Sequence, residues 1–160
     1  MRNLDEVNIN EGGEPVRTAS PNDDDFRQFE NYFGVELPQD YKIMLRHANG
    51  GHPEADSFTY YDGKGEDAVD TFYQLNGDQD DLDGVWKNTI HLRKVLDQAG
   101  LNSNVVAIGQ NGGGDQVFLR TSAKPPSVHI LYRTDGNSIP KVADSFAEFI
   151  DALYIDPDYV

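Results

Sequence analysis

The stretch LPQDYKIMLRHANGG, residues 37–51, decides how the rest of the chain is interpreted. It predicts a short amphipathic helix over residues 38–49 with a marked start and a marked end. Pro38 suits the first helical position, where its missing N–H is not needed. Gly50 or Gly51 can adopt the left-handed conformation that ends a helix. Four apolar side chains recur at helical spacings and therefore share one face: Tyr41, Met44, Leu45 and Ala48.

Upstream, the sequence predicts another helix, preceded by an extension. Residues 1–20 have little periodic apolar content, so we expect an N-terminal extension that is partly ordered. The run SPNDDD, residues 20–25, offers capping side chains and places carboxylates at the positive end of a helix dipole. An apolar stripe follows, and Gly34 can end the helix; the stripe consists of Phe26, Phe29 and Phe33.

Downstream, strands and helices alternate. Aromatic and β-branched residues predict strands over 57–61 and 69–75, joined by a turn at 62–65 and followed by a polar loop over 76–84. The remaining expected elements are a helix over 88–99, strands over 105–108, 116–121 and 128–134, and a C-terminal helix capped by Ser145. Tight turns between strands predict an α+β fold: a mostly antiparallel mixed sheet of about five or six strands packed with about four helices.

Composition limits the class of protein. A chain of 160 residues predicts a single domain, here over 21–160. It has no cysteine, so disulfides and thiolate chemistry are excluded. The sequence shows neither a secretory signal nor an apolar run that could span a bilayer, so we expect a cytoplasmic protein without membrane contact. A formal net charge of −15 disfavours direct binding to nucleic acid and favours a basic protein partner, unless it serves solubility alone.

The sequence contains no recognisable catalytic or cofactor motif. The four histidines lack metal-ligand spacing, and Gly112-Gly113-Gly114 lacks the Lys-Ser/Thr of a phosphate loop. The acidic loop fails the EF-hand pattern, because its first ligand and its bidentate Glu are missing. A solvated loop, a partner-facing patch and an irregular cation site remain open for the four aspartates of that loop: Asp78, Asp80, Asp81 and Asp83. We therefore expect no enzyme activity, no cofactor and no metal. A small hydrolase ranks behind the two binding functions described below.

Five short motifs in order resemble the SUKH superfamily, in the founding group that includes fungal cell-wall-synthesis regulators and bacterial immunity proteins. They span about residues 23–153. The motifs are Phe29-Glu30; Leu37-Pro38-x-Asp40-Tyr41; Asn49-Gly50-Gly51; Val106-x-Ile108-Gly109 with Gly113-Gly114-Asp115; and Ser145-Phe146-x-x-Phe149. Each has a scaffold role, so the resemblance implies the fold more directly than the function.

The resemblance implies binding: bacterial members commonly neutralise a cognate toxin, in many cases a basic nuclease. We expect acidic residues to steer association, and nearby aromatic side chains to slow dissociation. Trp86 suits either the core or an interface, and strand alternation places one of Tyr60 and Tyr61 outward. The candidate partner-binding residues are Tyr60, Tyr61, Asp62, Glu66, Asp67, Asp78, Asp80, Asp81, Asp83 and Trp86. The alternative function is an intracellular regulatory or scaffold module on the same fold.

Overall fold

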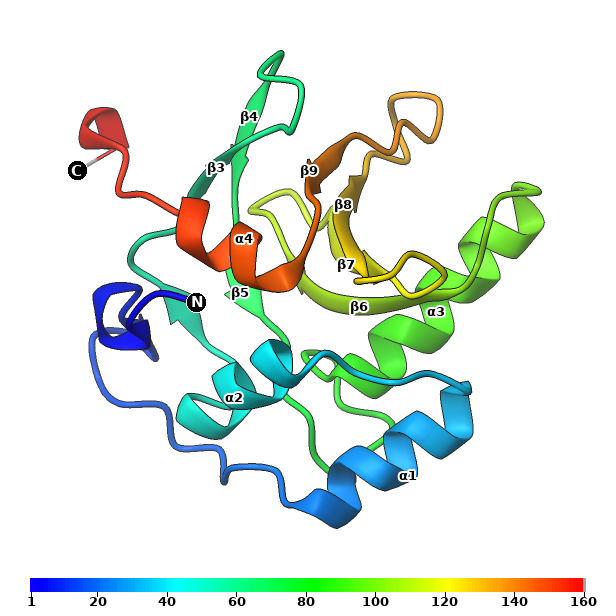
Figure 1. The fold of residues 1–160 in the computed structure, drawn as a ribbon, viewed down its shortest axis with the longest axis horizontal. Helices are drawn as coiled ribbons and strands as arrows, with labels where there is room; N and C mark the ends of the chain where they lie inside the picture. Colours follow the sequence, from blue (N-terminus) through cyan, green and yellow to red (C-terminus); the bar gives the residue numbers. More distant parts are fainter. Residues whose placement is uncertain (160) are drawn as a thin grey trace.

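The structure, a computed structural model, describes residues 1–159 (Figure 1). Four α-helices and nine short strands are described, with a 3₁₀ turn near each end of the chain. The helices are α1 (Asp23–Phe33), α2 (Gln39–His47), α3 (Val85–Gln98) and α4 (Phe146–Ala152). The strands are β1 (Ile9–Asn10), β2 (His52–Pro53), β3 (Ser57–Thr59), β4 (Glu66–Ala68), β5 (Thr71–Phe72), β6 (Val105–Gln110), β7 (Gln116–Arg120), β8 (Ser127–Leu131) and β9 (Lys141–Ala143).

The largest sheet has five strands in the order β5-β6-β7-β8-β9, and all its neighbours are antiparallel. Two small antiparallel ladders, β1–β2 and β3–β4, lie outside it. The predicted α+β class is therefore confirmed. The prediction of one strand over 69–75 is wrong, because only Thr71–Phe72 (β5) form a strand there and pair with β6, whereas the partner of β3 is β4. Strand β9 was missed; it is three residues long and its partner β8 lies across a turn-rich loop.

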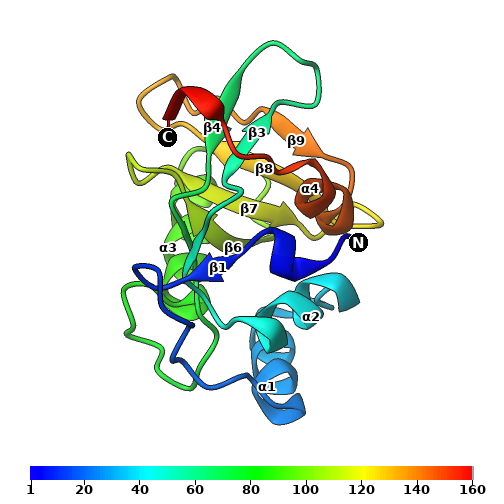
Figure 2. The same ribbon diagram turned by 90° about the vertical axis from the view of Figure 1, so that its left-hand side faces the viewer.

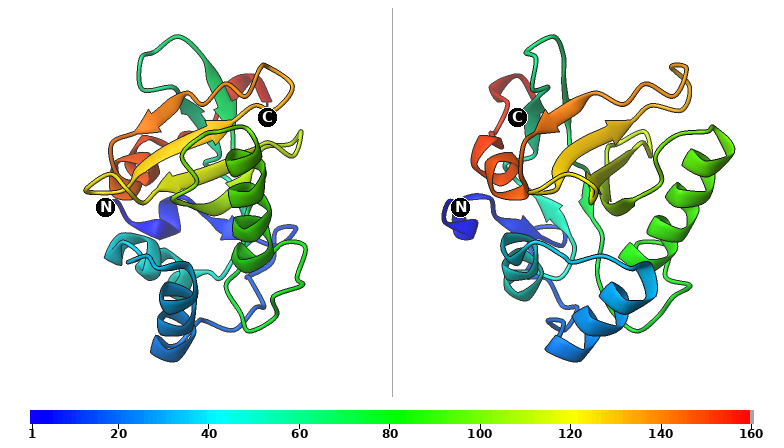
Figure 3. Two further views of the ribbon diagram at one scale, coloured as in Figure 1. Left: turned by 90° about the vertical axis from the view of Figure 1, so that its right-hand side faces the viewer. Right: turned by 45° about the vertical axis from the view of Figure 1, so that its right-hand side comes forward.

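Helices cover the large sheet on both faces. On one face, α4 contacts β8 and β9, and α2 packs on α4 (Figure 2). On the other face, α3 contacts β6 (Figure 3), and Asn88 of α3 accepts a hydrogen bond from Gln116 of β7 at 3.3 Å. A hydrogen bond joins α3 to β6, because the buried Oγ1 of Thr89 accepts from Ala107 N at 3.0 Å.

Helix α1 confirms its local prediction. The side chain of Asn22 accepts from Asp25 N at 2.9 Å, and the Asp25 carboxylate accepts from Asn22 N at 2.8 Å, which completes a capping box. Gly34 ends the helix in the left-handed conformation, with φ of 66°. The three stripe residues Phe26, Phe29 and Phe33 are buried.

Helix α2 forms, but its predicted boundaries are wrong. Pro38 is the N-cap, and the helix ends at His47 with Ala48 extended. The side chain of Asn49 instead forms hydrogen bonds to two distant segments. Its Nδ2 donates to Ala19 O at 2.8 Å and to Leu75 O at 2.9 Å, and its Oδ1 accepts from Leu75 N. A Cβ on Gly51 would meet Val16 Cγ2 at 2.9 Å. The Asn-Gly-Gly motif therefore joins three parts of the chain.

The first twenty residues contribute to the core. Leu4, Val7 and Ile9 are buried in the same apolar cluster as the rest of the chain. Arg2 Nη1 donates to Leu153 O at 2.7 Å, so the segment also contacts the end of α4. The N-terminal residues are thus packed to a greater degree than their low apolar periodicity indicated.

Candidate partner-binding surface

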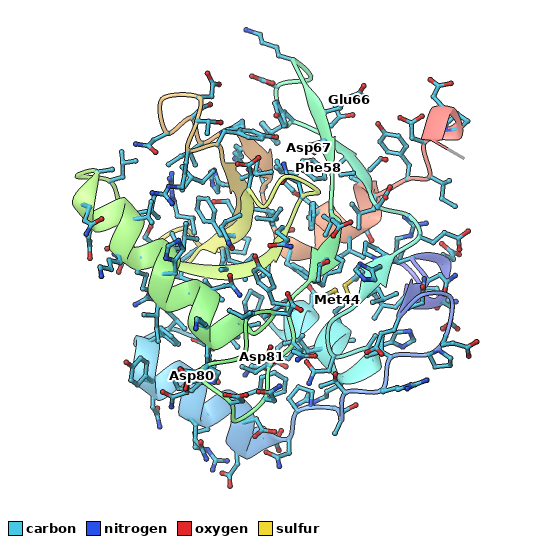
Figure 4. The ribbon with its side chains drawn as sticks, turned by 180° about the vertical axis from the view of Figure 1, so that it is seen from behind. Met44, Phe58, Glu66, Asp67, Asp80 and Asp81 are labelled. Carbon is cyan, nitrogen blue, oxygen red and sulfur yellow. The ribbon has the colours of Figure 1, made fainter. Side chains whose placement is uncertain are left out.

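The candidate residues fall into two separate regions. Tyr60, Tyr61, Asp62, Glu66 and Asp67 belong to the β3–β4 hairpin, which we call the acidic hairpin (residues 57–68). The four loop aspartates lie between β5 and α3, in what we call the Asp loop (residues 76–84). Figure 4 shows Glu66 and Asp67 near the upper end of the molecule, and Asp80 and Asp81 beside the foot of α3. The ten residues therefore do not form one surface.

The acidic hairpin has a tight, well-bonded turn. Tyr60 N donates to Gly65 O at 2.8 Å, and Asp62 Oδ1 accepts from Lys64 N at 2.9 Å. Gly65 lacks a Cβ that would otherwise lie 2.4 Å from the Tyr60 ring, so this glycine lets the ring pack across the turn. Tyr61 is 60% exposed and Tyr60 is half-buried, but the predicted strand over 57–61 ends at Thr59, so the turn and not strand alternation sets this difference.

Asp67 fastens this hairpin to the large sheet. Its carboxylate accepts hydrogen bonds from Tyr132 Oη, from Asn111 Nδ2 at 2.9 Å and from its neighbour Ala68 N at 2.8 Å. Tyr60 Oη donates in turn to Tyr132 Oη at 2.6 Å. Burial, reinforced by the bonds to Asp67 and Tyr60, raises the pKa of the Tyr132 phenol. We call the four residues Tyr60, Asp67, Asn111 and Tyr132 the Asp67 network.

An acidic groove of about 340 Å³ lies beside the hairpin. It is lined by carboxylates from three segments: Asp56, Glu66, Asp67 and Asp156. Tyr154 forms an aromatic wall, and its Oη donates to Glu66 Oε2 at 3.3 Å. Among residues 1–159, none of the four carboxylates pairs with a Lys or Arg side chain. Sequence reasoning missed Asp56, Tyr154 and Asp156; the last two reach the groove through backbone bonds between Ser57 and Tyr154.

The Asp loop is built from side chain to backbone turns. Asp80 N donates to Asp78 Oδ1 at 2.9 Å, and Asp83 N donates to Asp81 Oδ1 at 3.0 Å. Asp78, Asp80 and Asp83 are exposed, whereas Asp81 is half-buried. Over the described residues, no group of three His, Asp or Glu side chains is placed to hold a metal ion.

Asp81 differs from its neighbours because its second carboxylate oxygen points inward. That oxygen accepts hydrogen bonds from Gln74 Nε2 and from Asn76 Nδ2, the latter at 3.2 Å. Desolvation raises the pKa of Asp81, but the bonds from Gln74, from Asp83 N and from Asn76 outweigh it, so the pKa lies below its usual value. Asp81 is therefore a structural residue of the loop.

Trp86 corrects the sequence hypothesis of an exposed anchor. It is only 6% exposed and packs on α1, with ring centroids 5.4 Å from Phe29 and 5.2 Å from Phe33. Its free side is covered by Tyr32 at 4.9 Å. Trp86 thus belongs to the α1–α3 core and is no longer a candidate partner-binding residue.

One family model covers most of the chain. The model of the SMI1 / KNR4 family (SUKH-1) matches residues 20–152. The chain belongs to the SMI1 / KNR4 family (SUKH-1). No curated protein matches it. The SUKH-1 match includes the acidic hairpin, the Asp loop and the whole Asp67 network, whereas Tyr154 and Asp156 of the acidic groove lie just beyond it.

The SUKH-1 motif Gly113-Gly114-Asp115 has a specific task in this chain. Asn111 Oδ1 accepts from Gly113 N at 3.0 Å and from Asp115 N at 2.8 Å, which fixes the side chain of Asn111. The amide group of Asn111 is thereby aimed at Asp67. The turn at residues 111–115 therefore also positions the acidic hairpin. In the described residues, no helix is both long and apolar enough to cross a membrane.

Proposed function

We propose that this chain is a non-catalytic immunity protein that binds and neutralises a cognate bacterial toxin in the cytoplasm. Membership of the SUKH-1 family carries the proposal, because SUKH domains are known from immunity proteins. The net charge of −15 supports a basic toxin, such as a nuclease whose surface is built to bind phosphates.

The acidic hairpin is the proposed contact surface. Its carboxylates attract a basic partner over several ångströms, and exposed Tyr61 supplies an aromatic surface that is desolvated on contact. The Asp67 network supports this role, because it holds the hairpin in one conformation before the partner arrives. A preorganised surface loses less conformational entropy on binding. The Asp loop contributes to steering through its exposed charges.

Affinity purification tests the proposal. The tagged protein is recovered from its host with its partners, washed at low and at moderate salt, and the bound proteins are identified by mass spectrometry. The expected result is one dominant basic protein that is toxic when produced alone and harmless when produced with this chain. Diffuse partners that wash off at moderate salt would instead favour the regulatory or scaffold function.

A co-expression assay of toxin and variants tests whether the contact lies on the acidic hairpin. Tyr61→Ala and Glu66→Gln together are expected to weaken protection, whereas Ile43→Ala, at an exposed site on α2, is expected to leave protection intact. Equal protection by both variants would exclude the hairpin from the contact surface. Circular dichroism spectra of the two variants confirm that a loss of protection does not come from unfolding.

A further inference from the structure

The net charge of the chain hides a strong asymmetry. Residues 85–143 contain seven Lys or Arg against three Asp and no Glu, a formal charge of +4. The other residues therefore carry −19, since the total is −15. The basic segment comprises α3 and strands β6 to β9 with their loops, so its charges are gathered in one part of the fold.

Part of this basic charge lies along α3. Lys87, His91 and Lys94 follow each other at spacings of four and three residues and are exposed, so they form a stripe along α3. His91 lines a small hollow with Arg133, which joins the stripe to the end of β8. Figure 3 (left) shows α3 standing beside β7, β8 and β9 on this side.

Strand β8 is buried throughout and β7 is buried except at its ends, so the sheet adds half-buried Arg120 to this side of the molecule. Arg120 of β7 is opposite Ser127 of β8, and Phe118 is opposite His129, so these four side chains share the face turned away from α4. His129 is buried and stacks on Phe118, with ring centroids 5.6 Å apart. Burial, with the charges of Arg120 and Lys141, lowers the pKa of His129 to about 4, which agrees with a positive potential there.

Few of these charges are neutralised within the molecule. Of the seven Lys and Arg residues in the segment, Lys141 alone forms an ion pair within residues 1–159, with Asp144. Arg93 is held by the carbonyl oxygens of Val105 and Phe33 and lies over the Phe33 ring. The exposed Lys94 and Arg133 therefore remain available for a partner.

An apolar groove runs beside the basic stripe. It has a volume of about 480 Å³ and lies between α1 and α3, with Lys94 on its wall. Tyr32 is 62% exposed and Ile90 is 40% exposed, and both line it. Its polar rim holds two cations, Arg93 and Lys94, against one carboxylate, Asp97, so the rim is net cationic and fits a bulky apolar side chain that is flanked by carboxylates.

We propose that the side of the molecule formed by α3 and the ends of β7 and β8 binds an acidic polypeptide segment, with an apolar side chain of that segment between Tyr32 and Ile90. We call this side the basic face (Lys87, His91, Lys94, Arg120, Arg133). The positive charge of the basic face is complementary to the carboxylates of an acidic partner. The −19 on the rest of the chain repels either polyanion, and an acidic polypeptide is favoured over nucleic acid because its apolar side chain can enter the groove between Tyr32 and Ile90. The basic face is separate from the acidic hairpin and does not depend on the toxin role.

A peptide-binding experiment tests the basic face on the full chain. The probe is a fluorescein-labelled peptide of Glu and Asp residues around a central Trp, followed by fluorescence anisotropy at low and at moderate salt. Lys94→Glu with Arg133→Glu is expected to weaken binding by about fivefold or more at low salt, because two attractive contacts become repulsive. The matched control is Arg17→Glu with Lys64→Glu, which changes the net charge equally at two exposed sites off the basic face and is expected to change affinity less than twofold.

Two additional arms separate the possible causes. Ile90→Ser is expected to weaken the peptide with central Trp but not the same peptide with central Ala. An oligodeoxynucleotide of equal charge is expected to bind more weakly than the peptide. The proposal is overturned by absence of peptide binding, by an equal loss in both charge-reversed pairs, or by tighter binding of the oligodeoxynucleotide, which would assign the face to nucleic acid.

Discussion

The acidic hairpin and the Asp loop are both acidic but are built differently. In the hairpin, Asp67 is bonded to Tyr132 and Asn111 of the large sheet, so the carboxylates around it are held in place by the core. In the Asp loop, carboxylates mostly bond to the loop's own backbone. The comparison shows that a run of acidic residues specifies charge, whereas distant aromatic and amide partners determine whether that charge forms a fixed surface.

Trp86 gives the largest expected effect, because it follows the Asp loop and yet belongs to the core. Trp86→Ala should lower the free energy of unfolding by about 3–5 kcal/mol, since it removes a buried indole from the cluster with Phe29 and Phe33. The matched control is Leu82→Ala in the loop itself, where the side chain is exposed. Urea unfolding of both variants measures the difference. A stable Trp86→Ala protein that loses its partner would restore the interface role.

The Asp67 network gives the next effect. Tyr132→Phe removes the phenol that donates to Asp67 and accepts from Tyr60, which leaves two polar groups short of a partner. We expect a loss of about 1–3 kcal/mol in the free energy of unfolding. Tyr61→Phe removes a phenol oxygen from an exposed ring of the acidic hairpin and should change stability by less than about 0.5 kcal/mol. Equal stabilities for both variants would mean that the hairpin is not fastened through Asp67.

The sequence predicted those features whose partners are close along the chain. Helix α1 was predicted with its caps because Asn22, Asp25 and Gly34 act within one turn of its ends. The hairpin turn at 62–65 was predicted for the same reason. The role of Asp67 could not be read from the sequence, because Tyr132 and Asn111 lie 65 and 44 residues away.

The errors have the same origin. Asn49-Gly50-Gly51 looked like the end of a helix, whereas Asn49 bonds to Ala19 and Leu75 across the fold. The two groove residues Tyr154 and Asp156 lie in a short C-terminal segment without a helix or strand pattern, and only the pairing of Tyr154 with Ser57 places them. The charge asymmetry behind the basic face was present in the sequence but was concealed by the total of −15.

Asp81 provides a smaller effect within the Asp loop. Asp81→Asn should destabilise the protein by about 1 kcal/mol at pH 7, because it weakens the hydrogen bonds from Gln74 and Asn76, whereas Asp80→Asn should have little effect. The pKa of Asp81 is lower in the folded protein than in the unfolded chain, so the carboxylate stabilises the fold above its unfolded pKa. This contribution is lost as the pH falls through the folded pKa. The stability gap between wild type and Asp81→Asn should therefore close in acid, and a gap that persists in urea unfolding at low pH would argue against a role for the charge.

The smallest expected effect separates steering from contact. Asp78, Asp80 and Asp83 changed together to Asn remove three charges from the Asp loop, and Asp56→Asn, Asp62→Asn and Glu66→Gln remove three from the hairpin and groove. Both sets leave a net charge of −12, so long-range attraction of a basic toxin falls equally, and association should slow about two- to fivefold in both, less so at high salt.

Dissociation should accelerate only in the hairpin set, because only those carboxylates are expected to touch the bound partner. Surface plasmon resonance with the purified toxin at two salt concentrations measures both rates. Faster dissociation from the loop set alone would move the contact surface from the acidic hairpin to the Asp loop.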